Sequence, residues 1–99
     1  MCRENAAKIR FVEPSISQRF ATNLAKQRRA AGLSQEELAF RAAVHRTQVS
    51  LLERGDRLPR FETLIKIAGA LEVSVDTLTE GIVWEPIVSV SGGLKIAAD

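Results

Sequence analysis

Side chains that commonly carry catalysis are scarce in this chain of 99 residues. Its only cysteine is Cys2 and its only histidine is His45. Nucleophilic catalysis needs a nucleophile within hydrogen-bond reach of a base, and a metal site needs several converging ligands. Cys2 lies in the N-terminal arm and His45 at the start of a predicted helix, so no such pair or set can be drawn from them, and we predict no enzymatic activity, no bound metal and no cofactor.

Polar side chains suited to hydrogen bonding with base edges gather in the middle of the chain. If residues 45–54 form a helix with Val49 facing inward, Thr47 and Leu51 lie on its outer side. Arg46 could then bind O6 and N7 of a guanine, Gln48 could pair with an adenine, and an apolar side chain could meet a thymine methyl. The pattern predicts a helix that reads the DNA major groove, with a merely solvated helix face as the alternative.

Turn residues and helical spacing predict which elements position these side chains. A first helix begins at Ser15 or Ser17 and ends at Gly32. A short second helix begins at Ser34, because the hydroxyl of Ser34 and the carboxylate of Glu37 can form a capping box.

Three further helices follow. The third begins at His45 or Arg46 and stops at Gly55, and the fifth is capped by Ser74 and ends at Gly81. The fourth carries apolar residues at helical spacing: Phe61, Leu64, Ile65, Ala68 and Leu71.

The remaining segments are shorter. β-Branched residues and a Gly-Gly pair predict a small hairpin, with strands near 87–90 and 94–97. We therefore expect an all-α fold of five helices over residues 16–81, preceded by an arm at 1–15 and followed by a hairpin-like tail at 82–99.

Charge is segregated along the chain, although the net charge is only +2. Residues 19–60 contain nine basic and four acidic residues, a net +5, whereas residues 61–99 contain two basic and six acidic residues, a net −4. This division favours a polyanion as partner of the first part and another protein surface as partner of the second. The alternative is that two solvent-exposed faces simply differ in charge and bind no partner.

The stretch "LSQEELAFRAAVHRTQVSLLERGDRLPRFETLIKIAGALEVSVDTL" resembles the helix-turn-helix domain of the Cro/C1 type, also called the xenobiotic-response-element (XRE) family. The resemblance spans about residues 19–80, and it rests on the starts of helices two and five and on the end of helix three. Within the family, "HRTQVS" is similar to restriction-modification controller proteins, which are small dimeric regulators. The resemblance implies a five-helix Cro/C1-type domain that binds double-stranded DNA and regulates transcription, as a repressor or controller.

The same resemblance implies which residues contact DNA. The residues expected at base edges are Arg46, Thr47, Ser50 and Leu51, with Gln48 at the margin. Those expected at phosphates are Ser34, Gln35, Arg41, His45, Arg54, Arg57 and Arg60. For His45, capping the third helix is the alternative.

Two positions depart from the family pattern. Ala43 stands in the turn where the family usually has glycine, so a positive φ there would cost about 1 kcal/mol. Leu51 stands where a polar or basic residue is common, which leaves the base preference at that position open.

One ion pair is expected to be structural. The inward stripe of the first helix ends in Arg28, and Glu53 lies close to the core side of the third helix. The helical wheel and the resemblance both bring these two side chains together. Losing one partner of such a pair would cost about 3 kcal/mol if the site is dry.

A homodimer is expected because one reading helix covers only about four or five base pairs, so two copies on half-sites roughly 34 Å apart would give specificity. The apolar candidates for the dimer surface are Val75, Leu78, Ile82, Val83 and Trp84. The alternative for Trp84 is that its side chain packs into the core of its own domain and not against a second subunit. Two rivals remain: a helix-turn-helix antitoxin or adaptor held by a protein through its acidic half, and a protein-interaction module without a nucleic-acid partner.

A cytoplasmic protein without membrane contact is expected from the remaining features. The start of the chain lacks the apolar stretch of a signal peptide, and no apolar run approaches the roughly 18 residues of a membrane span. A single cysteine can form no internal disulfide.

Overall fold

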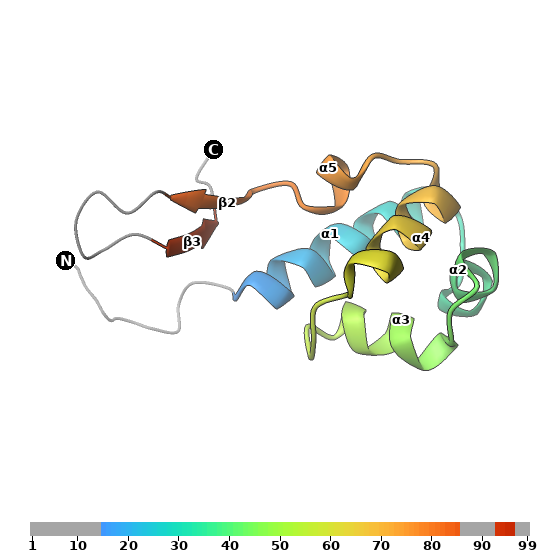
Figure 1. Cartoon of the computed structure of the whole chain (residues 1–99). Helices are drawn as coiled ribbons and strands as arrows, with labels where there is room; N and C mark the ends of the chain where they lie inside the picture. Colours follow the sequence, from blue (N-terminus) through green and yellow to red (C-terminus); the bar gives the residue numbers. More distant parts are fainter. Residues whose placement is uncertain (1–14, 86–92, 97–99) are drawn as a thin grey trace.

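The computed structural model describes the backbone of residues 15–85 and 93–96 and the side chains of residues 15–83. Its elements are α1 (Ile16–Ala30), α2 (Gln35–Ala42), α3 (Arg46–Glu53), α4 (Phe61–Leu71), α5 (Val75–Leu78), β2 (Ile82–Glu85) and β3 (Gly93–Ile96). The helices form one bundle in which α2 lies at the end opposite the strands and α3 lies along one side (Figure 1). The predicted all-α domain of five helices is confirmed.

Serine side chains fix the starts of three helices. The Ser15 hydroxyl accepts the backbone N–H of Gln18, and the Ser34 hydroxyl accepts that of Glu37, each within a complete capping box. Ser74 accepts the N–H of Thr77 at the start of α5. These bonds satisfy N–H groups that have no preceding carbonyl in the helix.

The ends of α1, α2, α3 and α4 share one turn. In each, one residue has a left-handed backbone, and the N–H of the residue after it donates to a carbonyl of the last helical turn, as in the Schellman motif. Glycine occupies the left-handed position at Gly32 and Gly55, with φ of 74° and 77°. The other two ends place Ala43 at φ 57° and Glu72 at φ 59°. Ala43 therefore does have the positive φ considered above, and Glu72 adds a second such residue that the sequence did not signal.

The core lies between the five helices, each of which contributes to it or packs against it. The largest side chains fully buried there are Phe20, Leu24, Leu38, Val49, Leu52, Ile67 and Leu78. The apolar face of α4 differs from the predicted set, because Phe61 and Ile65 are 77% and 46% exposed while Ile67 is fully buried. The other predicted residues do face the core: Ala68 and Leu71 are buried, and Leu64 packs against them.

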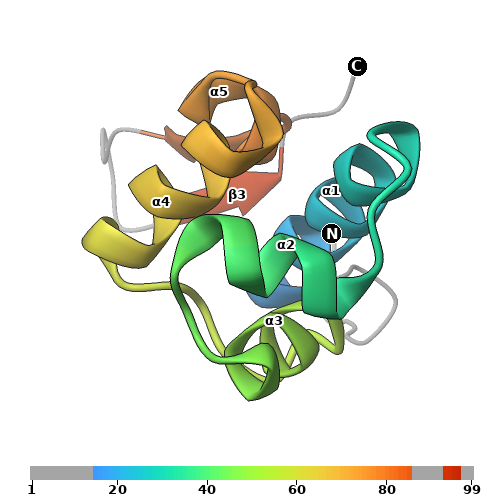
Figure 2. The same cartoon turned by 90° about the vertical axis from the view of Figure 1, so that its right-hand side faces the viewer.

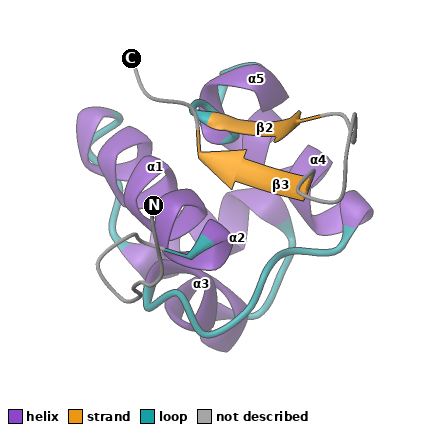
Figure 3. Ribbon diagram, turned by 90° about the vertical axis from the view of Figure 1, so that its left-hand side faces the viewer, coloured by secondary structure: helices purple, strands orange, loops and turns teal. Residues whose placement is uncertain are grey.

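The two strands form an antiparallel pair in which Ile82 lies opposite Ile96 and Trp84 opposite Leu94. Both strands contact α1, and Figure 3 shows them at the end of the bundle where α1 begins. The predicted second strand overlaps β3, whereas the predicted first strand at 87–90 lies outside the described residues, as does the arm at 1–14. No helix in the described part of the chain is long and apolar enough to cross a membrane.

Candidate nucleic-acid interface

The outer side of α3 carries several exposed polar side chains. Val49 and Leu52 point into the core, with 0% and 2% of their surfaces exposed. The side chains of Arg46, Thr47 and Gln48, all in the first turn of α3, are exposed. Figures 1 and 2 show α3 at the margin of the bundle, with no described element beneath it. Within the described part of the chain, this side of the helix is therefore uncovered.

Two predicted base-reading residues are less accessible than expected. Ser50 and Leu51 are half-buried, so Leu51 is not the bare leucine that the helical wheel indicated. Leu51 lies in the last turn of α3, and its carbonyl accepts the N–H of Asp56 at 3.1 Å as the chain folds back. The most accessible polar atoms are thus concentrated in the first turn of α3.

A partly buried ion pair fixes α3 against α1. The Nε atom of Arg28 lies 2.6 Å from Oε2 of Glu53, and its Nη2 atom lies 3.1 Å from Oε1. Only 13% and 6% of the two side chains are exposed. Arg28 also donates through Nη1 to the carbonyl of Leu33 at 2.7 Å. The hydrogen bond to Glu53 raises the pKa of Arg28 above its usual value, so the guanidinium stays positively charged.

Two smaller contacts complete the support of α3. The hydroxyl of Ser17 donates to the carbonyl of Gly55 at 2.9 Å, joining the start of α1 to the end of α3. At the other end of α3, Nδ1 of His45 accepts the backbone N–H of Thr47 at 3.3 Å. His45 therefore caps α3, and in its neutral form the ring carries its proton on Nε2.

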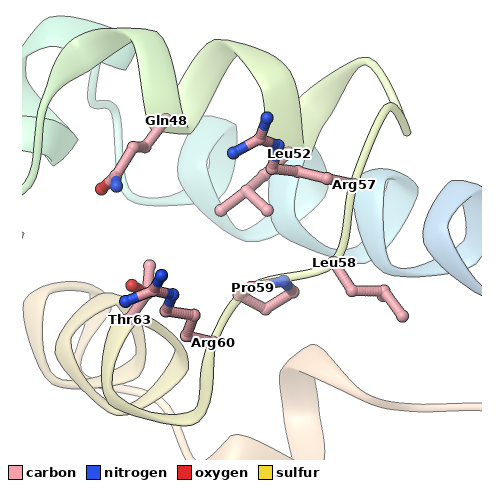
Figure 4. A pocket seen from close by; sticks show the side chains of 7 residues that line it. All are labelled: Gln48, Leu52, Arg57, Leu58, Pro59, Arg60 and Thr63. Atoms are coloured by element: carbon pink, nitrogen blue, oxygen red, sulfur yellow. The ribbon is translucent and has the colours of Figure 1, made fainter.

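The loop after α3 presents a second polar surface. Arg57 and Arg60 line a hollow of about 190 Å³ together with Gln48 of α3 and Thr63 of α4 (Figure 4). Arg60 is also the N-cap of α4 and makes no capping hydrogen bond through its side chain. Figure 4 shows the Arg60 guanidinium beside Thr63 at the start of α4 and the Arg57 guanidinium across the hollow beside Leu52, so positive charge faces the hollow from two sides, which favours a bound anion.

The remaining predicted phosphate contacts lie in three different settings. Gln35 donates its side-chain N–H to Oε1 of Glu53 at 3.0 Å, so it belongs to the ion-pair cluster, although its second amide hydrogen remains for another acceptor. Arg54 pairs with Asp56 at 3.0 Å on the surface. Ser34 uses its hydroxyl in the capping box of α2.

Arg41 belongs to another surface. It lines a shallow hollow on α2 with Glu36, Glu37 and Phe40, so its neighbours there are two carboxylates and an aromatic ring. The structure does not bring Arg41 together with Arg57 and Arg60. Phe40 itself is 87% exposed.

Sequence reasoning missed three parts of the site. The link from Gln35 to Glu53 was not expected, although both residues had been singled out. Thr63 was not among the predicted contacts; it lies in the first turn of α4, three residues after Arg60, and this helical spacing is the signal that could have found it. The exposed Phe40 lies one residue from the buried Ala39, and helical spacing alone would have placed it outward.

The residues predicted for a dimer surface differ in accessibility. Leu78 is fully buried in the core of the protomer, so its side chain is not available to a second chain. Val75 and Ile82 are half-buried and pack against that core, whereas Val83 is 46% exposed. The side chain of Trp84 lies outside the described residues.

This geometry agrees with the comparison of the chain with known families. The family HTH_3, described as helix-turn-helix, matches residues 24–78, which is more than half of the chain. The chain therefore belongs to this family of Cro/C1-type DNA-binding domains, and the predicted class is confirmed. It is a family of transcriptional regulators rather than of enzymes.

Individual relatives include repressors and controllers. The chain is 42% identical over 55 residues to the cryptic phage CTXphi transcriptional repressor RstR of Vibrio cholerae, covering 56% of this chain and 49% of the repressor. It is 40% identical over 63 residues to control protein C.SmaI of Serratia marcescens, covering 64% and 75%. The restriction-modification controller protein C.AhdI from Aeromonas hydrophila has a similar structure, with a TM-score of 0.61 and 37% identity over 63% of this chain and 94% of that one. The chain thus spans about half the length of the repressor, and the predicted resemblance to controller proteins is confirmed.

Proposed function

We propose that this protein regulates transcription, as a repressor or controller, by binding a specific double-stranded DNA site as a homodimer, with α3 of each subunit in the major groove. The observation that carries the proposal is the exposed first turn of α3, where Arg46, Thr47 and Gln48 point away from a helix fixed by core packing and by the Arg28–Glu53 ion pair. A rigid helix with free donors and acceptors on one side is suited to reading base edges.

Arg57 and Arg60 support the proposal because they lie beside Gln48 in the same hollow. A phosphate bound there would be next to the groove occupied by α3. The uncapped start of α4 adds backbone N–H groups to the two positive charges. In this arrangement, α3 supplies sequence preference and the loop supplies attraction to the backbone.

The small number of exposed polar residues on α3 supports the proposal of a homodimer. Three accessible side chains can distinguish only a few base pairs, so a second copy is needed to specify a useful site. We assign the dimer surface to α5 and β2, with Val75, Ile82, Val83 and Trp84 as the apolar candidates, and we leave out the buried Leu78.

Selection of bound duplexes from a random pool tests the proposal, because a dimeric reader returns sites with twofold symmetry. On the selected site, Arg46→Ala is expected to lower affinity about 10- to 100-fold while binding to unrelated DNA is kept. The matched control is Arg29→Ala, which removes an exposed arginine from α1. Equal affinity of Arg46→Ala and the unsubstituted protein for the selected site would show that Arg46 does not read bases.

Salt dependence tests the phosphate contacts separately. Arg57→Ala and Arg60→Ala are each expected to weaken binding to every duplex and to lower the slope of log affinity against log salt by about one. A slope that stays at the value of the unsubstituted protein in both variants would contradict a phosphate site in this hollow.

A protein partner is the second candidate function, and one observation favours it. Phe40 is 87% exposed on α2, beside Glu36 and Glu37. An antitoxin or adaptor could use this aromatic side chain to hold another protein, since aromatic residues are enriched at interfaces. A partner that competes with DNA, or that binds with little dependence on salt, would favour this function.

A further inference from the structure

A tight turn connects α5 to β2. The N–H of Ile82 donates to the carbonyl of Thr79 at 3.0 Å, and Gly81, the third residue of the turn, has φ 85°. A positive φ at the third position is typical of a type II turn. We call residues 79–82 the Glu80 turn, because the carbonyl of Glu80 belongs to its central peptide.

Two side chains of α1 bind the Glu80 turn. The Nδ2 atom of Asn23 donates to the carbonyls of Leu78 and Glu80, both at 3.0 Å. Nε of Arg19 donates to the same Glu80 carbonyl at 3.2 Å. The guanidinium also covers the turn closely, since a Cβ added at Gly81 would lie 2.9 Å from the Arg19 Nε atom.

Asn23 is the only buried polar residue among the described side chains, with 9% of its surface exposed. Both hydrogens of its amide are used by the two carbonyls, so the side chain joins α1 to the end of α5 and to the turn at once. Breaking either bond would leave a buried polar group without a partner, which is costly. The direction in which β2 leaves the bundle is therefore fixed by α1.

The same helix fixes the position of α3. Arg28 binds Glu53, and Ser17 binds the carbonyl of Gly55. Asn23 lies between Ser17 and Arg28 in α1, so the contacts to α3 and to the Glu80 turn come from one rigid element. Figure 1 shows α1 running from the strands through the bundle, and Figure 3 shows the strands where it begins.

We propose that Asn23 and Arg19 are positioning residues that set the separation between the two reading helices of the dimer. The inference rests on the proposed homodimer, with its contacts on α5 and β2. In such a dimer, any tilt of β2 relative to α1 changes the distance between the two copies of α3. A change of about 3.4 Å corresponds to one base pair, so a loosened Glu80 turn would accept half-sites at neighbouring spacings.

The test measures affinity for duplexes that carry the selected half-sites at the natural spacing and at one or two base pairs more or less. The full chain is expected to prefer one spacing by about tenfold or more over its neighbours. In Asn23→Ala, this preference is expected to fall to about threefold or less, while affinity for a single half-site and the helical circular dichroism stay unchanged. The matched control is Thr22→Ala, which removes an exposed bond from Thr22 to the Gln18 carbonyl on the same helix.

Arg19→Ala gives a second variant, because Arg19 is only half-buried and its loss leaves the core intact. If Asn23→Ala does not fold, the spacing preference of Arg19→Ala decides the question. An unchanged preference in the folded variants would overturn the inference. A full chain that sediments as a monomer at concentrations where it binds the selected site would overturn the homodimer, and the inference with it; Arg46→Ala would still report on base reading.

Discussion

Removing the carboxylate of Glu53 should be among the most damaging single changes in this domain. Arg28 and Glu53 meet through two hydrogen bonds of 2.6 and 3.1 Å, and 13% and 6% of their side chains are exposed. Glu53→Ala would leave the Arg28 guanidinium in a mostly dry site and the Gln35 amide without its acceptor. Breaking a buried pair from one side costs about 3–5 kcal/mol. That is a large part of the roughly 5–15 kcal/mol that stabilises a domain of this size.

Thermal unfolding followed by circular dichroism provides the assay. A loss of about 3 kcal/mol should lower Tm by roughly 12–24 °C in a domain of fewer than 100 residues. The internal control is Asp56→Ala, which breaks the Arg54–Asp56 pair; its side chains are 62% and 52% exposed, so a change below about 1 kcal/mol is expected.

A double variant separates the charge effect from the loss of packing. Arg28→Met combined with Glu53→Leu leaves no unpaired charge, so it should lose less stability than Glu53→Ala alone. If Glu53→Ala costs no more than Asp56→Ala, the pair is as weak as a surface pair, and the argument from its burial is wrong.

Two further predictions concern helix ends. Ala43→Gly and Glu72→Gly should each raise the free energy of unfolding by about 0.5–1 kcal/mol, because left-handed φ is strained for both residues and both side chains are exposed; the right-handed Ala31 (φ −83°) is the control, where glycine should lower stability in the same urea titration. The backbone N–H of Ser34, helped by its hydroxyl, lowers the pKa of the Glu37 carboxyl below its usual 4.5, so this contribution to stability is present above that pH and is lost as the pH falls through the lowered pKa. Glu37→Gln should keep the capping bond and lose the pH dependence, and equal acid sensitivity of the two proteins in thermal unfolding between about pH 6 and pH 3 would speak against this origin.

Local signals were sufficient to predict most of the fold. Ser15, Ser34 and Ser74 each carry a capping pattern that the structure uses, and Gly32 and Gly55 end helices as expected. These signals depend on neighbouring residues alone, so they can be recognised without knowledge of the tertiary packing.

Other features depended on contacts that are distant in the sequence. Phe61 and Ile65 fit the helical spacing of the buried Ala68 and Leu71, and the packing of α4 against α2 decides that Ile67 faces the core while they do not. Leu51 is half-buried because the chain turns back after α3. Gln35 donates a hydrogen bond to Glu53, which is 18 residues away in the sequence. Periodicity locates a helix and its faces, but it cannot choose between two adjacent apolar stripes.

The contacts that Asn23 and Arg19 make with the Glu80 turn end on main-chain oxygens. Every amino acid supplies such an oxygen, so the residues at 78 and 80 can be replaced during evolution without removing an acceptor. Gly81 is constrained by its φ of 85° and by the guanidinium above it, and Leu78 is constrained by its burial in the core rather than by this contact. A lineage that keeps Arg19, Asn23 and this glycine can therefore exchange the sequence beyond residue 82, and with it the choice of partner subunit, while inheriting the same geometry of attachment.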